Sequence, residues 1–487
     1  MKININIVKT LSVLTFVLLF SCGDDFVDVE SENQNSDNFF NSEEDYQNAL
    51  TGAYDLLQAT YLNVMLGEIA SDNTLAGGES ATDVPGIQEI DDMIHTPVNS
   101  QLRDIWSWMF AGVNRANFIL EFQGKTDFTG KNEIIAQARF LRAYYYFELV
   151  KWFGDVPLVV DKRFQFGDQF EVERTPKAEV YAQIELDLIF AADNLPATQT
   201  ETGRITKGAA QALLGKAYLF QNKFDEAATI LDQAIAGPYD LVTDYNSIFE
   251  FDGENNIESV FEIQYTDEEG AGFECLQCSE GNVAVGFNGI RNYNGPVFES
   301  GFSFNIPTQE VVDEFEDGDI RKDVAILDIN AWADDTGATF STGFEHTGYY
   351  NRKYISRKGD LNTGDANLTN PNNYRAIRFA DVLLMAAEAN NRKPSPNDTK
   401  AQTYLNRVRD RAELIDVTAT GSDLTTAIYH ERRVELVGEG HHFFDLVRTG
   451  RAAQEIDGFQ SGKHEVFPIP SIEIQLAGNR WNQNPGY

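Results

Sequence analysis

The sequence predicts a mainly α-helical protein built from tetratricopeptide-like helix pairs, with a large loop-rich, partly β insertion that carries the ligand face. Three observations support this class. Apolar residues recur at helical spacing, one segment matches the spacing of a helical-hairpin repeat, and a long central stretch lacks a helical period. The expected order is a signal segment at 1–21, a helical region at 22–238, the insertion at 239–374 and a second helical region at 375–487.

The chain begins with a segment that resembles an export signal. Lys2 and Lys9 precede the apolar run 11–20, which is too short to span a bilayer. Cys22 directly follows this run and resembles the acylated first residue of bacterial lipoproteins, so we predict lipidation there; an ordinary cleaved signal is the alternative. The acidic segment 23–26 resembles the tag that sends Bacteroidetes lipoproteins outward. We therefore expect lipid anchoring in the outer membrane and exposure at the cell surface.

The composition excludes several classes of partner. Against 38 Lys and Arg the chain has 76 Asp and Glu, so its formal net charge is −38. Repulsion between like charges argues against nucleic acid and anionic lipid surfaces, which leaves the lipid anchor as the expected contact with the membrane. With 42% apolar residues the chain can nevertheless bury a large core, and it is not a disordered acidic tail.

The cysteines offer little chemistry. If Cys22 is acylated, only Cys275 and Cys278 remain, and a lone C-x-x-C lacks the second ligand pair of a structural zinc site. A local disulfide is favoured in an oxidising exterior, with free thiols and metal or redox chemistry as the alternatives. We expect no bound metal and no cofactor.

The clearest internal pattern lies in the segment 208–238. It follows the tetratricopeptide spacing W-x2-L-G-x2-Y and the later small, large and small positions, except that Gln211 stands for Trp and Leu231 for Phe. Small residues at Gly215 and Ala227 would let two helices approach closely. We predict a degenerate repeat, with an unrelated helix pair as the alternative. A single hairpin cannot bury its own apolar face, so several hairpins must stack.

Three further stretches carry apolar stripes at helical spacing, which we interpret as core. The stripes are Ile134, Ala138, Leu141, Tyr145 and Leu149; Val180, Ile184, Leu188 and Ala191; and Ile377, Ala380, Leu384 and Ala387. They predict helices on both sides of the central insertion.

Between residues 239 and 373 the composition of the sequence changes and no long helical period is present. Gly, Asn, Asp and aromatic residues dominate, with short strand-like runs such as 259–265. A stretch of this length is too long for a passive connection, and long loops on a rigid scaffold are where binding usually resides. We therefore place the ligand face in this insertion.

Several segments match, in order, the pattern of the SusD/RagB lipoproteins, which this chain resembles from Cys22 to its last residue. The matching segments are 138–157 (ARFLRAYYYF to WFGDVP), 379–389 (FADVLLMAAEA), 405–412 (LNRVRDRA), 431–436 (ERRVEL), 439–440 (EG), 445–448 (DLVR), 468–470 (PIP) and 483–487 (QNPGY). One departure is visible: the family usually has Arg soon after the Glu-Gly pair, whereas His441 and His442 stand here. Adjacent helical residues point about 100° apart, so we expect these two to pack locally rather than chelate together.

The resemblance implies a helical scaffold, an inserted binding region, and a seat over a SusC-like TonB-dependent outer-membrane transporter. It implies capture of an oligosaccharide or polysaccharide at the cell surface; a RagB-like peptide binder is the alternative. Two arginines on one helix, Arg139 and Arg142, and the pair Arg378 and Asp381 on another suit ion pairs between helices, so we do not assign them to the ligand.

Catalysis finds no support in the motifs. The segment 430–434 (HERRV) lacks the second His of a zinc protease, and 313–324 lacks two ligands of a calcium loop. The sequence contains no phosphate-binding loop, dinucleotide fingerprint or G-x-S-x-G elbow. We expect a binding protein rather than an enzyme.

The physics of sugar binding selects candidate ligand residues. Sugar rings stack on exposed aromatic rings, and Asp, Asn and Arg bind the hydroxyls. Trp332 is the first candidate, although it could instead anchor its own loop; Tyr293 beside Arg291 is the second, and the polar turn at Asp72 and Asn73 is the third. The acidic chain makes a neutral glucan a better ligand than a strongly anionic glycan such as alginate.

Overall fold

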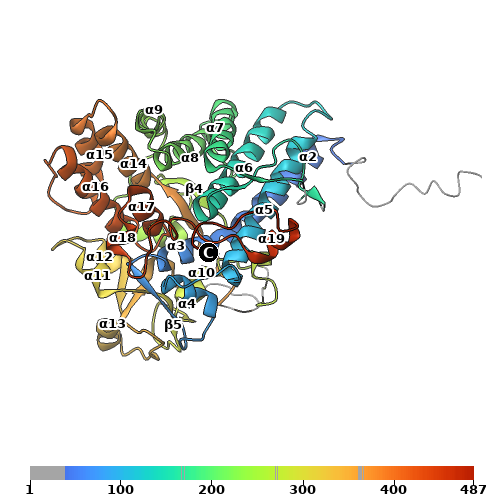
Figure 1. Cartoon of the computed structure of the whole chain (residues 1–487). Coiled ribbons are helices and arrows are strands. Elements are labelled where there is room, and N and C mark those ends of the chain that lie inside the picture. Colours follow the sequence, from blue (N-terminus) through green and yellow to red (C-terminus); the bar gives the residue numbers. More distant parts are fainter. Residues whose placement is uncertain are drawn as a thin grey trace, which may run out of the picture.

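Helices form most of the body, as the sequence predicted (Figure 1). The computed structural model describes residues 39–487 except 166, 169–170, 269, 271, 360–364 and 366. The predicted signal segment and Cys22 lie outside the described residues. No helix within the described part of the chain is long and apolar enough to cross a membrane.

Among the described residues, eight α-helices precede the insertion. They are α2 (Glu43–Asp55), α3 (Tyr61–Ile69), α4 (Pro85–Asp91), α5 (Ser100–Glu121), α6 (Lys131–Phe153), α7 (Lys177–Asn194), α8 (Lys207–Phe220) and α9 (Phe224–Ile235). Local chemistry sets where several of them begin, since side chains accept backbone N–H groups that a helix leaves unpaired. Ser42 and Asp45 form a capping box at α2, Asn99 caps α5 and Thr206 caps α8.

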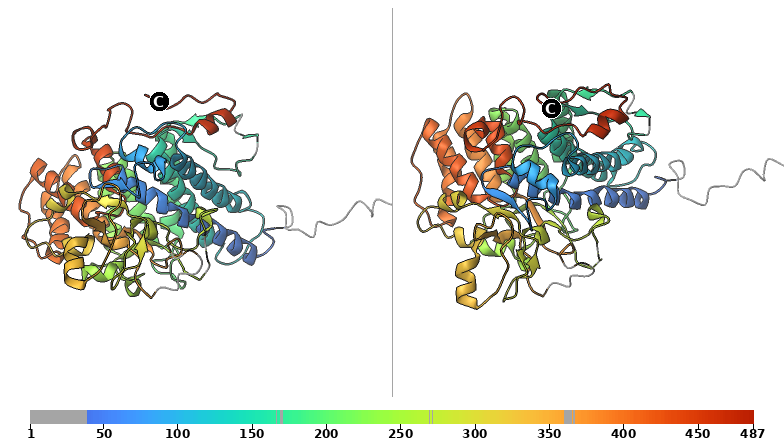
Figure 2. Two further views of the ribbon diagram at one scale, coloured as in Figure 1. Left: turned by 90° about the horizontal axis from the view of Figure 1, so that it is seen from below. Right: turned by 60° about the horizontal axis from the view of Figure 1, so that its bottom comes forward.

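The C-terminal half adds six more α-helices. They are α14 (Phe379–Arg392), α15 (Asp398–Arg411), α16 (Gly421–Glu435), α17 (His442–Thr449), α18 (Ala452–Glu455) and α19 (Ser471–Leu476). Helix α14 packs against α8 and α9, α15 and α16 pack against α14, and α19 lies apart from them (Figure 2). The predicted stripe for α14 began too early, because Ile377 and Arg378 belong to the preceding strand β10 (Tyr374–Arg378). Arg378 is therefore the residue before the helix rather than part of its face.

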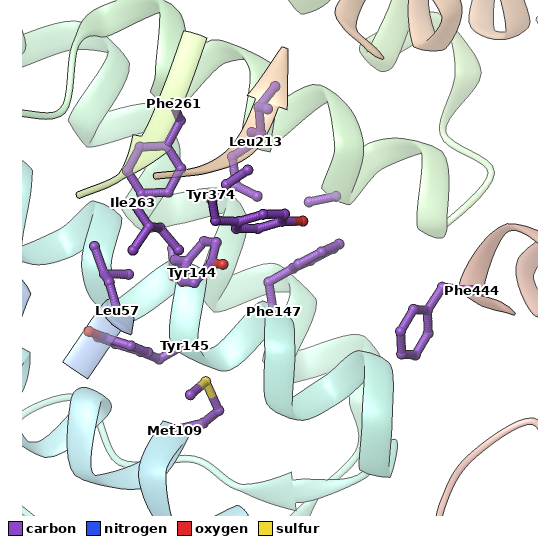
Figure 3. Packing of buried hydrophobic residues seen from close by; sticks show 14 of the residues in the cluster. Leu57, Met109, Tyr144, Tyr145, Phe147, Leu213, Phe261, Ile263, Tyr374 and Phe444 are labelled. Carbon is purple, nitrogen blue, oxygen red and sulfur yellow. The ribbon is translucent and has the colours of Figure 1, made fainter. Parts of the chain in front are cut away.

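Small residues set how closely the helices approach. In the predicted repeat, α8 and α9 form a hairpin, and a methyl group added at Gly215 would lie 2.4 Å from the Leu231 side chain. In the same way, a methyl group at Gly112 of α5 would lie 2.5 Å from the ring of Tyr145 on α6. The predicted close approach at Gly215 is confirmed, and the core around Tyr145 contains the aromatic residues of α6 together with Leu213, Phe261 and Tyr374 (Figure 3).

The insertion consists of short helices and paired short strands. Its elements are β4 (Ser259–Ile263), α10 (Ala284–Asn288), β5 (Ile290–Arg291), β6 (Ser300–Gly301), β7 (Phe304–Pro307), α11 (Gln309–Asp313), α12 (Lys322–Ala325), β8 (Ile326–Asp328), α13 (Ile329–Thr336) and β9 (Tyr349–Asn351). The strand predicted within 259–265 is β4, which pairs antiparallel with β10. Figure 1 shows α13 and β5 on the side of the molecule opposite α7 to α9.

Strand pairing also ties the insertion to the N-terminal half. Strand β1 (Thr74–Gly77) runs antiparallel to β7, with Thr74 opposite Pro307 and Gly77 opposite Phe304. Within the insertion, β8 pairs antiparallel with β9 and β5 pairs parallel with β6, while β2 (Val156–Pro157) pairs with β3 (Arg174–Thr175) in the helical body. The insertion is therefore held at β1 and β10 as well as by its chain ends.

Buried ion pairs join the helices, as the charged hallmark residues predicted. Arg142 of α6 binds both carboxylate oxygens of Asp187 on α7, each at 2.8 Å. Asp381 of α14 pairs with Arg432 of α16 at 2.7 Å rather than with its neighbour Arg378.

A second cluster of ion pairs surrounds Glu435 at the end of α16. Its carboxylate accepts hydrogen bonds from three arginines: Arg411 at 2.6 Å, Arg378 at 2.7 Å and Arg321 at 2.9 Å. Burial alone would raise the pKa of Glu435, but these guanidinium groups hold it well below its usual range. The carboxylate is therefore ionised and paired inside the core.

Candidate functional site

The insertion has a hydrophobic core of its own, on which the candidate site rests. Trp332 and Phe340 lie at its edge and are partly exposed. Its buried members are Ile290, Tyr293, Phe298, Ile306, Leu327, Ile329, Ala338, Tyr350 and Ile355. The two rings at the edge therefore sit on a packed base instead of on a loose loop.

Trp332 is positioned by α13 and by two aromatic neighbours. The side chain of Asp328 caps the helix by accepting from the backbone N–H groups of residues 330 and 331. The indole N–H of Trp332 donates to the Tyr293 hydroxyl at 2.8 Å, and its ring centroid lies 5.3 Å from that of Phe298. Tyr293 in turn donates to the carbonyl of Pro296 at 2.7 Å and is only 8% exposed. The sequence named Trp332 and Tyr293 as rival stacking residues, whereas the structure uses Tyr293 to hold Trp332.

Arg291 lies where three loops meet. Its guanidinium donates to the Ser303 hydroxyl at 3.1 Å and to the Phe302 carbonyl at 2.6 Å, which fixes its orientation. The remaining edge faces Glu79 at 3.9 Å and Asp83 at 3.7 Å, both from the loop after β1. Arg291 is mostly buried, but the carboxylate of Glu79 is 77% exposed. Glu79 and Asp83 were not predicted from the sequence. Gly77 and Gly78 directly before them could have indicated the turn, and both residues have positive φ angles in the structure.

We use the term insert face for Trp332 and Phe340 together with the loops 77–84, 291–295 and 339–346. The loops are joined by backbone hydrogen bonds from residue 78 to 303, from 344 to 78 and between 294 and 339. Asn292 is exposed on this face and donates from its side chain to Ser341 at 3.2 Å. Aromatic rings, amides and carboxylates are thus presented together, which suits stacking on a sugar ring and hydrogen bonding to its hydroxyls.

Asp72 and Asn73 do not belong to the insert face as free side chains. Asn73 is fully buried; its amide donates to Glu68 at 3.0 Å and its oxygen accepts from Arg433 at 2.9 Å. Asp72 accepts from Arg433 at 2.6 Å. We leave both residues out of the proposed glycan site, since Asn73 is buried and Arg433 of α16 holds one carboxylate oxygen of Asp72.

The two insertion cysteines lie apart from Trp332, after β4. The structure bonds Cys275 to Cys278, with their Cα atoms 5.3 Å apart. The pair closes a short turn that packs beside the turn Leu56–Thr60 of the N-terminal half.

Other hollows are formed by the helical body. A cavity of about 330 Å³ is lined by residues from α2, the segment before α8, and β4, among them Tyr54, Gln58 and Arg204. A cavity of about 180 Å³ beside α5 and α19 has aromatic walls that include Trp106 and Trp481. Trp106 is almost fully buried, in agreement with its assignment to the core.

Comparisons with known proteins agree over nearly the whole chain. One family model, described as SusD family, matches residues 264–466, and another, described as starch-binding associating with outer membrane, matches residues 25–219. The curated SusD-like protein P2 of Formosa agariphila is 27% identical, over 93% of this chain and 94% of the relative.

Solved structures share the fold over nearly the whole chain. A laminarin-binding SusD-like protein is 34% identical with a TM-score of 0.83, over 92% of this chain and 100% of that one. Surface glycan-binding protein A from Bacteroides thetaiotaomicron, solved in complex with laminarihexaose, is 27% identical with a TM-score of 0.81, over 91% and 99% of the two chains.

The fold and the insert face define a scaffold of stacked helices that carries a loop-built surface with aromatic rings. That architecture and the comparisons identify the chain as a member of the SusD-like family. The family resemblance read from the sequence hallmarks is therefore confirmed.

Proposed function

We propose that this protein is a cell-surface lipoprotein that binds a neutral glycan at the insert face and delivers it to a SusC-like TonB-dependent transporter. The observation that carries the proposal is Trp332, a partly exposed indole held on a packed base by Tyr293 and Phe298. Support also comes from the relatives whose descriptions name laminarin or laminarihexaose. The protein itself is expected to turn over no ligand.

The charge of the insert face supports a neutral ligand. Glu79 and Asp83 stand beside Arg291 and outnumber it, so an anionic glycan would meet net repulsion there. Carboxylates accept hydrogen bonds from sugar hydroxyls without any such penalty. A β-glucan of the laminarin type is the ligand we propose, in preference to alginate.

Affinity electrophoresis over laminarin, other neutral glucans and alginate tests the binding. Trp332→Ala should lose about 1–3 kcal/mol of binding free energy, because a flat stacking ring is removed. Trp332→Phe keeps a ring and should recover most of the retardation by laminarin. The matched control is Trp108→Ala, which removes a partly exposed indole from α5 in the helical body. Unchanged retardation by Trp332→Ala would move the site away from the insert face.

The anchor and the partner are tested separately. Cys22→Ala should release the protein in soluble form, whereas the wild type should be lost from intact cells on surface proteolysis. Purification of a tagged protein from outer membranes in mild detergent should bring down a barrel of roughly twice its mass, with the helical body as the docking surface, because stacked hairpins present a broad rigid face. Recovery of the protein alone, under conditions that preserve other membrane complexes, would favour a free-standing binder.

A further inference from the structure

Three side chains from distant parts of the sequence converge beneath β1. Asp72 lies in the turn after α3, His442 is the first residue of α17, and Glu455 is the last residue of α18. Their oxygen and nitrogen ligand atoms all lie within 4.8 Å of one another. We propose that Asp72, His442 and Glu455 form a binding site for a divalent transition-metal cation, with Zn²⁺ as the best-suited ion.

The geometry of the first two donors fits a shared cation. Oδ1 of Asp72 and Nε2 of His442 lie 3.0 Å apart, and the two side chains are 7% and 5% exposed. The two atoms contact each other, and within the described part of the chain neither has an aligned hydrogen bond to any further group. Two donors that each lie about 2.0–2.1 Å from a tetrahedral zinc ion are roughly 3.3–3.4 Å apart, so a shift of a few tenths of an ångström would let Oδ1 and Nε2 share the ion.

The neighbouring arginines leave Oδ1 of Asp72 free but contact the carboxylate of Glu455. Arg433 binds the other oxygen of Asp72 at 2.6 Å, so Oδ1 stays available. Arg451, the residue before α18, donates to both oxygens of Glu455, at 3.1 and 3.4 Å, so Glu455 would share one oxygen between Arg451 and the ion. Metal-binding carboxylates are commonly oriented by such outer contacts.

The charged side chains around the site carry a net negative charge. Arg433 also faces Glu310 at 3.7 Å and Glu314 at 3.0 Å. Asp72, Glu455, Glu310 and Glu314 supply four negative charges, and Arg433 and Arg451 supply two positive ones, so two negative charges remain before any histidine proton is counted. A divalent cation would neutralise them.

The donor set indicates which ion. One imidazole nitrogen with two carboxylates suits Zn²⁺, which takes three protein ligands and an open position for water. Ca²⁺ takes six to eight oxygen ligands and Mg²⁺ prefers oxygen, so both are poorer candidates. The side chain of Glu455 is 29% exposed, which gives the ion a route of entry.

An ion here would brace the base of the insert face. It would link α17 and α18 to the turn before β1, and the carbonyl of Asp72 in that turn accepts from Thr308 at 3.1 Å. Strand β1 leads directly into the loop 77–84 of the insert face. The site would thus be a structural cross-link between the two ends of the chain rather than a contact to the glycan.

The test uses the untagged mature protein, stripped of metal with a chelator and titrated with Zn²⁺, Mn²⁺ and Ca²⁺ by calorimetry. We expect one saturable Zn²⁺ per chain and a higher melting temperature with Zn²⁺. His442→Asn and Glu455→Gln should weaken Zn²⁺ binding by at least about tenfold, whereas His346→Asn, a partly exposed histidine of the insertion, should leave it unchanged. Glu455 is partly exposed, so its variant should fold even if His442→Asn does not. Failure to saturate at one ion, or full retention of Zn²⁺ by Glu455→Gln, would overturn the proposal and leave an Asp72–His442 ion pair.

Discussion

Removal of the charge of Glu435 should destabilise the whole protein. Glu435→Gln keeps the size of the side chain but sets an amide among Arg411, Arg378 and Arg321, which all donate to the carboxylate. Removing one partner of a buried ion pair typically costs about 3–5 kcal/mol, because the remaining charges stay buried without compensation. Unfolding entropy of about 2.1 cal/mol/K per residue, over roughly 450 residues, converts this loss into a fall in melting temperature of about 3–5 °C.

Thermal and urea unfolding of the two proteins at pH 7 measure the effect. The matched control is Glu413→Gln, which removes the same charge from an exposed turn after α15 and should shift the melting temperature by less than about 1 °C. The pKa of Glu435 is lowered in the folded state, so its contribution is present above pH 4.5 and is lost as the pH falls further. The gap between wild type and Glu435→Gln should therefore narrow in acid. If Glu435→Gln melted with the control, buried charge pairing would not hold α16 in place.

Two further substitutions test packing and pH dependence. Gly112→Ala should lower the free energy of unfolding by about 1–3 kcal/mol, because the added methyl group would lie 2.5 Å from the Tyr145 ring. Urea unfolding measures this change. A stability equal to that of the wild type would show that α5 and α6 can move apart freely. Burial raises the pKa of Asp91, whose carboxylate accepts from the N–H of Ala76 at 2.6 Å, to about 7. Its folded-state pKa lies above the unfolded value, so wild type should lose stability as the pH rises from about 4 through 7, and Asp91→Asn should remove that loss. In urea unfolding, the free energy of unfolding of Asp91→Asn should rise by a few kcal/mol relative to that of the wild type between pH 4 and pH 8. A difference between the two proteins that did not change with pH would contradict the raised pKa of Asp91.

The helices were the predictable part of this fold, because their signals are local. The stripe in α6 and the Gly215–Leu231 contact follow from spacing alone. Ile377 and Arg378 were placed in a helix because an apolar period continues across the boundary, whereas pairing with β4, more than a hundred residues away, makes them a strand. The spacing of residues within one segment carries no information about a pairing strand so far away in the sequence.

The candidate site was predictable only in part for the same reason. Trp332 stood out as the single Trp of the insertion, but its bond to Tyr293 depends on how two loops pack. Asp72 and Asn73 were predicted to be available to a ligand because they stand in a polar turn. Arg433, which binds one carboxylate oxygen of Asp72 and the side-chain oxygen of Asn73, comes from the other end of the chain. Polar residues in a turn therefore do not show whether their side chains are free to bind a ligand.

The pairing of β1 with β7 has a consequence for how the chain folds. Thr74 meets Pro307 only after more than two hundred intervening residues have been placed, and the Asp72–Arg433 contact spans 361 positions. Contacts between residues so far apart in the sequence form only after a long loop has closed, and loop closure costs entropy. We therefore expect slow folding with a single late, cooperative step. Fragments cut at residues 238 or 374 should therefore fail to fold independently, and the polypeptide should be open to proteases until its C-terminal helices arrive.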